Sequence, residues 1–557
     1  MRKLRLRLPL GVIAITLTLL LAPLLGRAAR CEEPAPEREI LRARVEQIRD
    51  DPSFSILGAE LAAKRLIADL YARRGFTRAW SAPEARDDLL RAIRDSAADG
   101  LDPEDYLLGA LETAQRAAQA PGASIQVRID HDLLLSEALI RLLYHVSFGK
   151  VDPKSLDPSW NFTRRLHVGD SVERVQQLID SGELYARVEL AKPQHAMYRG
   201  LKAELARHRA LAQAGGWPTV SAGPTLEPGA SDPRVRELRA RLEASGDPTE
   251  SLPIDELVYD QALENAVKAF QARHGLDVDG RVGRATLEAL NAPVAERIEK
   301  LLVNLERGRW LLHELDPTFV VVNVAGFQVY YLRDREVVWS ARAVVGQQYR
   351  ATPIFRSTMT YLVFNPTWTV PPSILEHDIL PDQRRDRSTL ARKQLEVIDA
   401  SGRTVPESEV DWSSATAQSF PYLLRQRPGP ENAMGRVKFM FPNAHSVYLH
   451  DTPSRDLFER SRRAASSGCI RIENPLDLAA LLLEGQSEWD RAAIERAIES
   501  GETRTVSLAR PVPVLVAYWT AWVDRNGVLQ LRPDIYGSDA KVAAALRAEF
   551  RFRRRTR

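Results

Sequence analysis

The sequence predicts a multidomain α+β protein: a mostly helical N-terminal part, a small helical bundle, and a mainly-β C-terminal domain with an insertion. Three observations predict this fold class. The chain has 557 residues, which at about 150 residues per domain suffices for three or four domains. Apolar residues recur at helical spacing in the first half, and their period changes to two from Phe319 onward. A segment rich in Pro, Gly and Ser, residues 221–232, separates the helical part from the bundle.

Composition and charge are those of an ordinary globular protein. Hydrophobic residues make up 44% and charged residues 27% of the chain, which excludes wholesale disorder. The formal net charge is +3 and no strongly basic domain stands out, so we expect no nucleic-acid partner. The only two cysteines, Cys31 and Cys469, exclude a disulfide framework and a cysteine-based zinc module.

The N-terminus has the pattern of an export signal, which we assign to residues 1–30. Four basic residues precede an apolar run from Leu8 to Leu25, and small residues follow it. The run is long for a signal, so two alternatives stay open: cleavage near Ala28, or retention as a single-span anchor. Both alternatives export the rest of the chain. Because cysteine is so scarce, we expect a bacterial periplasmic protein, either released or anchored in the inner membrane.

Residues 35–220 are expected to form the helical domain. Apolar residues recur at helical spacing in 56–71, 89–98 and 133–146. A turn at Gly100 leads into a further helix, in which Asp102 is the expected N-cap.

Residues 230–293 are expected to form the compact helical bundle. Val235, Leu238 and Leu242 share one helix face, and Val267 and Phe270 point inward from a second helix. A glycine-rich turn then leads into a last helix, and a connecting helix is expected over 297–315.

The β domain is expected over residues 317–508. Strands are predicted from Phe319, from Phe327 and from Val337, with a turn at Asp334–Arg335 between the last two. Further elements are expected as strands at 359–363, 447–450 and 512–523 and as a helix at 475–484.

Residues of about 373–432 interrupt the strand pattern. They are polar, helical in parts and contain Pro428-Gly429-Pro430, which indicates an insertion on the sheet domain. Residues 509–557 are expected to be a C-terminal strand and tail that complete either the helical domain or the β domain.

The segment that carries chemistry joins Tyr448-Leu449-His450-Asp451 to Ser466-Ser467-Gly468-Cys469. Cys469 lies in a polar, glycine-flanked turn, whereas a structural cysteine prefers an apolar interior. A nucleophile needs a nearby base and backbone N–H groups that hold an oxyanion. His450 ends a predicted strand, and Tyr448 shares its strand face. The pattern favours a catalytic cysteine–histidine pair over the alternative of a buried thiol and a surface histidine.

This pattern resembles the L,D-transpeptidases with a YkuD-type catalytic domain. Their signature is a histidine, a spacer and Ser-Gly-Cys, followed two residues on by Arg or Asn. The sequence has these residues at His450, Ser467, Gly468, Cys469 and Arg471. Many members carry histidine where Ser467 stands, and the serine variant is similar to the large periplasmic subgroup.

Three further stretches extend the resemblance over most of the chain. Asn365-Pro366-Thr367-Trp368 resembles the segment that lines the donor cleft, although Trp368 is alternatively a core residue. Residues 266–280 resemble a helical peptidoglycan-binding module, and are alternatively the core and turn of a plain bundle. The turn at Gly100 resembles the scaffold region of the same large enzymes.

The resemblance implies a role for each candidate residue. Cys469 is the nucleophile and His450 the general base and acid. His450 either deprotonates a neutral thiol or rests with it as an ion pair, and either the Asp451 side chain or a backbone carbonyl orients the imidazole. Tyr448, Gly468 and Ser467 complete the catalytic turn and its oxyanion site, and Trp368 and Asn365 bind substrate. Arg471 either binds a stem carboxylate of the substrate or braces the loop.

The resemblance also implies a reaction, in which a tetrapeptide donor stem acylates Cys469 and a diaminopimelate acceptor stem resolves the thioester into a 3–3 cross-link. No cofactor or metal is expected, the insertion acts as a lid, and carbapenems acylate the cysteine. A D,D-carboxypeptidase and a glycan polymerase are candidate partners. Three alternatives stay open: an L,D-carboxypeptidase, a transferase acting on a lipoprotein lysine, and a non-enzymatic envelope scaffold.

Overall fold

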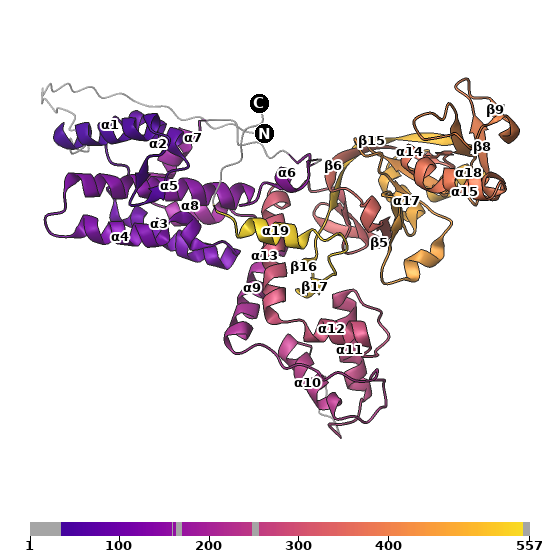
Figure 1. Ribbon diagram of the computed structural model, residues 1–557, viewed down its shortest axis with the longest axis horizontal. Helices are drawn as coiled ribbons and strands as arrows, with labels where there is room; N and C mark the ends of the chain where they lie inside the picture. The colour runs from indigo at the N-terminus through magenta and orange to yellow at the C-terminus, as the bar shows by residue number, and fades with distance from the viewer. Residues whose placement is uncertain (1–34, 159, 163–169, 248–254, 550–557) are drawn as a thin grey trace, which may run out of the picture.

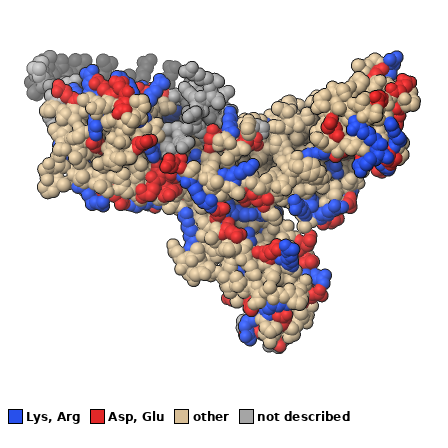
Figure 2. All heavy atoms as spheres, in the orientation of Figure 1, with Lys and Arg blue, Asp and Glu red and all other residues tan. Residues whose placement is uncertain are grey.

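The computed structural model describes residues 35–158, 160–162, 170–247 and 255–549, so the expected signal at 1–30 lies outside the described residues. Figure 1 shows a helical part, a small helical module and a β domain, which confirms the predicted fold class. On the face drawn in Figure 2, acidic and basic side chains are interspersed over all three parts. In these described ranges, no helix combines the length and apolarity needed to cross a membrane.

The helical part is built around α5, a helix whose residues are mostly buried. The other helices except the short α6 pack around it. The helices of this part are α1 (Ala35–Asp50), α2 (Lys64–Arg73), α3 (Pro83–Asp95), α4 (Leu108–Gln119), α5 (Ile125–Phe148), α6 (Pro153–Leu156), α7 (Ser171–Ile179) and α8 (Leu184–Leu190), with the 3-10 helices η1 (Ser96–Asp99) and η2 (Pro103–Tyr106) between α3 and α4.

For the helical part, the expected N-cap is confirmed and the expected bounds of one helix are wrong. The Asp102 carboxylate accepts the Glu104 N–H at 3.0 Å at the start of η2, so the predicted N-cap is confirmed. The helix expected over 56–71 begins only at Lys64. Residues 55–60 instead form a hairpin of β1 (Ser55–Ile56) and β2 (Ala59–Glu60), whose turn holds Leu57 and Gly58 at positive φ.

The module consists of α10 (Arg234–Ser245), α11 (Gln261–His274) and α12 (Arg284–Asn291). The two expected apolar faces are buried in one core, as predicted. Residues 221–232 are not a free linker, because Leu226 is buried in the same core. Its backbone exchanges two hydrogen bonds with Val282, of 3.2 and 2.9 Å.

Two long helices, α9 (Ala196–Gln213) and α13 (Val294–Leu311), join the three parts. Leu201 and Leu205 of α9 and Leu301 and Leu305 of α13 form a junction core with one face of the β domain. The connecting helix expected at 297–315 is therefore α13, which begins and ends slightly earlier.

The β domain is a nine-stranded sheet in the order β13-β5-β14-β12-β11-β6-β15-β3-β4. The long strand β5 also pairs with β4, which closes the sheet on itself. The strands are β3 (Phe319–Asn323), β4 (Gln328–Arg333), β5 (Glu336–Gly346), β6 (Phe355–Phe364), β11 (Val437–Met440), β12 (Leu449–His450), β13 (Ala464–Ser466), β14 (Ile470–Ile472) and β15 (Arg504–Ala517), and the helices α17 (Pro475–Leu483) and α18 (Arg491–Glu499) pack against them.

The strand β3 is buried on both faces. Val320 and Val322 point into the core inside the sheet, whereas Phe319 and Val321 point into the junction core. The expected turn between β4 and β5 has both Asp334 and Arg335 in the left-handed region, at φ 52° and 70°. A tight turn of this kind matches the twist of the flanking strands.

The insertion, which we call the lid after its expected role, has its own small core. Its sheet has the order β7-β10-β8-β9, and Val370, Trp412 and Leu424 are among its buried residues. The lid strands are β7 (Trp368–Thr369), β8 (Leu395–Ile398), β9 (Thr404–Val405) and β10 (Leu423–Gln426), and its helical segments are α14 (Pro372–Ile374), the π-helix η4 (Leu375–Ile379), α15 (Leu380–Arg385), α16 (Thr389–Arg392) and the 3-10 helix η5 (Glu407–Glu409).

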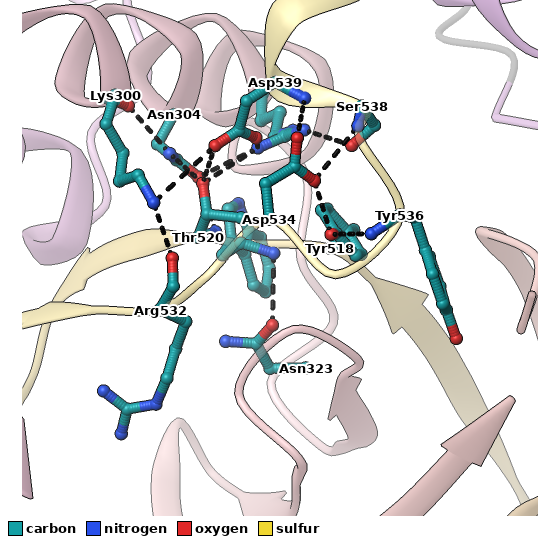
Figure 3. Close-up of polar contacts among 12 residues, drawn as sticks. Lys300, Asn304, Asn323, Tyr518, Thr520, Arg532, Asp534, Tyr536, Ser538 and Asp539 are labelled. Carbon is teal, nitrogen blue, oxygen red and sulfur yellow. Dashed lines mark hydrogen bonds and ion pairs between the residues drawn. The ribbon is translucent and has the colours of Figure 1, made fainter. Parts of the chain in front are cut away.

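The C-terminal region contributes a strand to the β domain and also packs against α13. Strand β15 runs across the domain boundary expected at 508 and pairs with β6 and β3. The following β16 (Ala521–Val523), β17 (Leu529–Leu531) and α19 (Asp539–Leu546) continue onto α13. Figure 3 shows the polar contacts that fasten this region, residues 518–539, to Asn304 and Lys300 of α13.

Candidate active site

Strand register brings the predicted residues onto one face of the sheet. His450 on β12 pairs with Lys438 on β11 and with Arg471 on β14. Because side chains alternate along a strand, Cys469 shares the face of Arg471, and Tyr448 shares the face of His450. The alternate residues Leu449, Ile470 and Ile472 are fully buried in the opposite core.

The turn that carries Cys469 is held by its own backbone. Gly468 has φ +112°, a conformation that favours glycine. Its N–H donates to Ser466 Oγ at 3.2 Å, and Ser466 Oγ donates to the carbonyl of Cys469. The N–H of Ile470 donates to the carbonyl of Tyr448 at 3.0 Å, which docks the turn beside β12.

The imidazole of His450 is buried and oriented by main chain. Its Nδ1 donates to the backbone carbonyl of Asp451. A carbonyl only accepts, so the proton is on Nδ1 and Nε2 keeps its lone pair. The carboxylate of Asp451 is engaged elsewhere: it accepts from the Arg436 N–H and from the Arg455 guanidinium. Of the two alternatives for orienting His450, the structure has the carbonyl.

The histidine and the cysteine rest in their neutral forms. Burial, helped by Arg471 and Lys438, lowers the pKa of His450 to about 3, against the opposing carbonyls of Asp451 and Met434. Burial raises the pKa of the Cys469 thiol, while the Tyr448 backbone N–H, Lys438 and Arg471 act in the other direction. At neutral pH this favours a thiol beside a neutral imidazole over an ion pair. The Cys469 Sγ lies 3.8 Å from the Ser446 carbonyl oxygen.

Lys438 is a member of this face that the sequence patterns did not single out. Its Nζ lies 4.1 Å from the centroid of the Tyr448 ring. One feature of the sequence could have indicated it. Lys438 stands between Val437 and Phe439, the two buried apolar residues on the other face of this strand. Burial and the neighbouring thiol raise the pKa of Tyr448, so its phenol stays protonated and can donate a hydrogen bond.

Ser467 connects the catalytic turn to the lid. Its exposed hydroxyl accepts from Arg350 Nη1 at 2.9 Å. The same guanidinium forms a two-point ion pair with Asp378 on η4 of the lid. Arg350 is thus a second residue that sequence patterns missed, because it depends on a contact between segments that are far apart in the chain.

The expected substrate-binding residues lie in three different settings. Arg471 lies on the face of Cys469 and His450. The half-buried Trp368 packs against the lid core, so it forms part of the lid base. The amide of Asn365 donates to the carbonyls of Ala497 and Ile498, at 2.8 and 3.1 Å, at the end of α18. This contact favours a structural role for Asn365 over the expected contact with substrate.

Over the ranges given above for the structure, no group of three or more His, Cys, Asp or Glu side chains gathers in a way that holds a metal ion. The side chains on this face supply a thiol, an imidazole, a phenol and two cations.

Family models match three parts of the chain. Residues 317–494 match the L,D-transpeptidase catalytic domain, called YkuD. Residues 65–205 match a family described as Scaffold domain. Residues 231–290 match a family provisionally described as a peptidoglycan-binding domain. The chain therefore carries the three domains that the sequence resemblance implied.

Individual relatives are similar over parts of their length. A Haemophilus influenzae protein, provisionally named an L,D-transpeptidase, is 34% identical over 250 residues, which are 44% of this chain. The match spans about half, 49%, of that relative. An L,D-transpeptidase structure from Mycobacterium smegmatis is 16% identical, with 36% of this chain and 58% of the other covered, at a TM-score of 0.18. One from Xylanimonas cellulosilytica is 15% identical, with 53% and 99% covered, at a TM-score of 0.16.

Proposed function

We propose that this chain, which carries a scaffold domain, a peptidoglycan-binding domain and an L,D-transpeptidase catalytic domain, is a peptidoglycan L,D-transpeptidase that forms 3–3 cross-links through a cysteinyl thioester. The observation that carries the proposal is the single sheet face shared by Cys469, His450, Tyr448, Lys438 and Arg471. A thiol beside an imidazole with a free Nε2 suits acyl transfer, because the imidazole can take and return one proton.

In the acylation step, His450 Nε2 takes the thiol proton as Cys469 Sγ attacks the carbonyl carbon of the third residue of a tetrapeptide stem. Lys438 and Arg471 stabilise the thiolate that develops. The Tyr448 phenol and a backbone N–H of the turn hold the oxyanion. The imidazolium then returns its proton to the departing D-alanine amine, the C–N bond breaks, and a thioester remains.

In the second step, the side-chain amine of a diaminopimelate residue in an acceptor stem attacks the thioester. The amine loses a proton to His450, the C–S bond breaks, and Cys469 recovers its thiol. The acceptor is joined through a new amide bond. Water at the same position would instead release a tripeptide, which is the L,D-carboxypeptidase alternative.

The lid and the module would direct this chemistry towards cross-linking. The lid contacts the catalytic turn through Arg350, so its closure would exclude water from the thioester. The module would hold the protein on the cell wall and raise the local concentration of stems. Peptidoglycan stems are exported, so we place the folded part of the chain in the periplasm, in keeping with the export pattern at residues 1–30.

The test is mass spectrometry of muropeptides after incubation of residues 35–557 with disaccharide tetrapeptide, with Cys469→Ala as the control. We expect dimers linked through two diaminopimelate residues in the wild type and none in the variant. Tripeptide monomers alone would replace the proposal with the carboxypeptidase. No product in either protein, together with no acylation of the thiol by a carbapenem, would leave only a non-enzymatic scaffold.

A further inference from the structure

The phenol of Tyr536 joins two strand ends beside the catalytic turn. Its hydroxyl donates to the carbonyl of Gly346 at 2.7 Å, at the end of β5. The same oxygen accepts the N–H of Thr352 at 3.1 Å, on the loop that leads to β6. The loop is packed tightly at this point, because a Cβ on Gly346 would lie 2.1 Å from the Arg350 carbonyl oxygen. Tyr536 therefore fixes both ends of this β5–β6 loop.

Thr352 connects the β5–β6 loop to the turn that carries Cys469. Its Oγ1 is buried, accepts the N–H of Gly346 at 2.8 Å and donates to the carbonyl of Gly468 at 2.8 Å. Gly468 precedes Cys469 directly. One hydroxyl thus connects the loop held by Tyr536 to the peptide group between Gly468 and Cys469.

The direction of that peptide group decides where the Cys469 N–H points. A trans peptide is planar, and its C=O and N–H point in opposite directions. With the Gly468 carbonyl held by Thr352, the Cys469 N–H is turned to the other side of the peptide plane. The Gly468 N–H is already bonded to Ser466. Among the residues that the structure describes, no acceptor takes the Cys469 N–H, so this donor on the nucleophilic residue itself is available to an oxyanion.

The position of Tyr536 is itself set by a rigid polar network. Its ring stacks on Tyr518 at a centroid distance of 5.4 Å, and its N–H donates to the Tyr518 hydroxyl at 3.0 Å. Tyr518 in turn donates to Asp534 at 2.6 Å. Figure 3 shows that this group continues through Asp539 and Thr520 to Asn304 of α13. Tyr536 is therefore anchored to the helix that joins the three parts of the chain.

We propose that Tyr536, acting through Thr352, is a positioning residue that aims the Cys469 N–H at the oxyanion of the acyl-transfer step. The proposal deepens the proposed function and rests on it for the identity of the acyl donor. The physical requirement is general, however. Any acyl group that Cys469 accepts passes through a tetrahedral oxyanion, whereas alkylation of the same thiol develops no oxyanion.

The test compares these two reactions on the same thiol. Acylation is measured as the burst of p-nitrophenol from p-nitrophenyl acetate, and alkylation as the rate of Cys469 modification by iodoacetamide, both at one pH. Loss of one oxyanion donor costs about 10²–10³-fold in rate, and a displaced donor costs less. For Tyr536→Phe we expect acylation to slow by roughly tenfold and alkylation to keep its rate.

Variants at Thr352 make the test specific. Thr352→Ser keeps the hydroxyl and should retain acylation, whereas Thr352→Val should lose about as much as Tyr536→Phe. The double variant should lose little more than either single one, because both residues act on one peptide group. Tyr185→Phe is the matched control, since it removes a tyrosine hydroxyl bonded to Asp95 in the helical part.

Two results would overturn the proposal: unchanged acylation in Tyr536→Phe, or an equal loss of acylation and alkylation, which would mean that Tyr536 only controls access to the thiol. If Thr352→Val does not fold, the comparison of Tyr536→Phe with Thr352→Ser decides. No peptidoglycan is present in these assays. A wild type that reacts with both reagents but cross-links no stems would therefore contradict the proposed function and leave this inference standing.

Discussion

His450 donates its Nδ1 proton to the backbone carbonyl of Asp451 and not to the Asp451 carboxylate. The orientation of the imidazole is therefore independent of the charge on its neighbour. The carboxylate, buried with Arg436 and Arg455 as its partners, has a structural task. The first prediction tests these separate roles of the Asp451 carbonyl and carboxylate.

Asp451→Asn should lower stability more than activity. The substitution keeps the carbonyl that orients His450 but weakens two charge-assisted hydrogen bonds, so we expect a lower Tm and an acylation rate within about threefold of the wild type. His450→Asn should retain the fold and lose about 10²–10⁴-fold in acylation, the usual contribution of a general base. Thermal unfolding and the p-nitrophenyl acetate burst measure the two effects. A comparable loss of activity in both variants would contradict the carbonyl-oriented imidazole.

The pH profile of thiol alkylation should report a neutral resting pair. The pKa of Cys469 is raised by burial, so the thiolate fraction, and with it the rate of reaction with iodoacetamide, should still be rising at pH 8. The midpoint should lie above about 8.5, the ordinary cysteine value. Because the pKa of His450 is lowered to about 3, protonation of the imidazole should not cause a second step between pH 5 and 7. A plateau reached by pH 7 would indicate a thiolate–imidazolium pair.

Lys438 should assist thiolate formation by its charge. Lys438→Met removes a cation beside the thiol and should slow alkylation at pH 8 by roughly threefold to tenfold. Lys438→Arg keeps the charge and is the matched control, with a rate close to that of the wild type. Equal rates in the methionine variant and the wild type would assign Lys438 to packing on the Tyr448 ring alone.

The contact between Arg350 and the lid should favour aminolysis over hydrolysis. Asp378→Asn weakens the ion pair that holds η4 to Arg350 but leaves the bond from Arg350 to Ser467 in place. We expect the ratio of cross-linked dimers to tripeptide monomers to fall by about threefold, because water enters a loosened site. Arg403→Gln, which removes an exposed lid ion pair with Asp399, is the control. An unchanged product ratio would mean that the lid does not exclude water.

Removal of the module should matter more for polymeric than for soluble substrate. Trp217 Nε1 donates to the carbonyl of Ala292 at 3.0 Å, so the two ends of the module lie side by side. Residues 218–291 can therefore be replaced by a short Gly-Ser bridge. We expect about a tenfold loss on intact sacculi, as expected when tethering is lost, and little change on soluble muropeptides. Equal losses on both substrates would indicate a structural role for the module.

Local patterns predicted the parts of this structure that depend on neighbours in the chain. Alternation placed Tyr448 and His450 on one strand face, and Asp102 and Pro103 predicted the start of η2. Relationships set by long-range register were beyond such patterns. Lys438 belongs to the site only because β11 pairs with β12. The role of Asn365 follows from its contact with α18, more than a hundred residues later in the chain.

The network around Tyr536 has a consequence for the order in which the site is completed. The chain is made from its N-terminus, so the β5–β6 loop, the cysteine and the tyrosine emerge in that order. Until residues 518–539 have folded onto α13, the thiol of Cys469 is present, but Tyr536 does not yet hold the β5–β6 loop. The Gly468–Cys469 peptide group is then not fixed through Thr352. On the proposed mechanism, an incomplete chain would have the Cys469 thiol, but its Cys469 N–H would not be oriented towards the oxyanion. Acylation of such an incomplete chain would then be slow, and full reactivity would require residues 518–539 to fold.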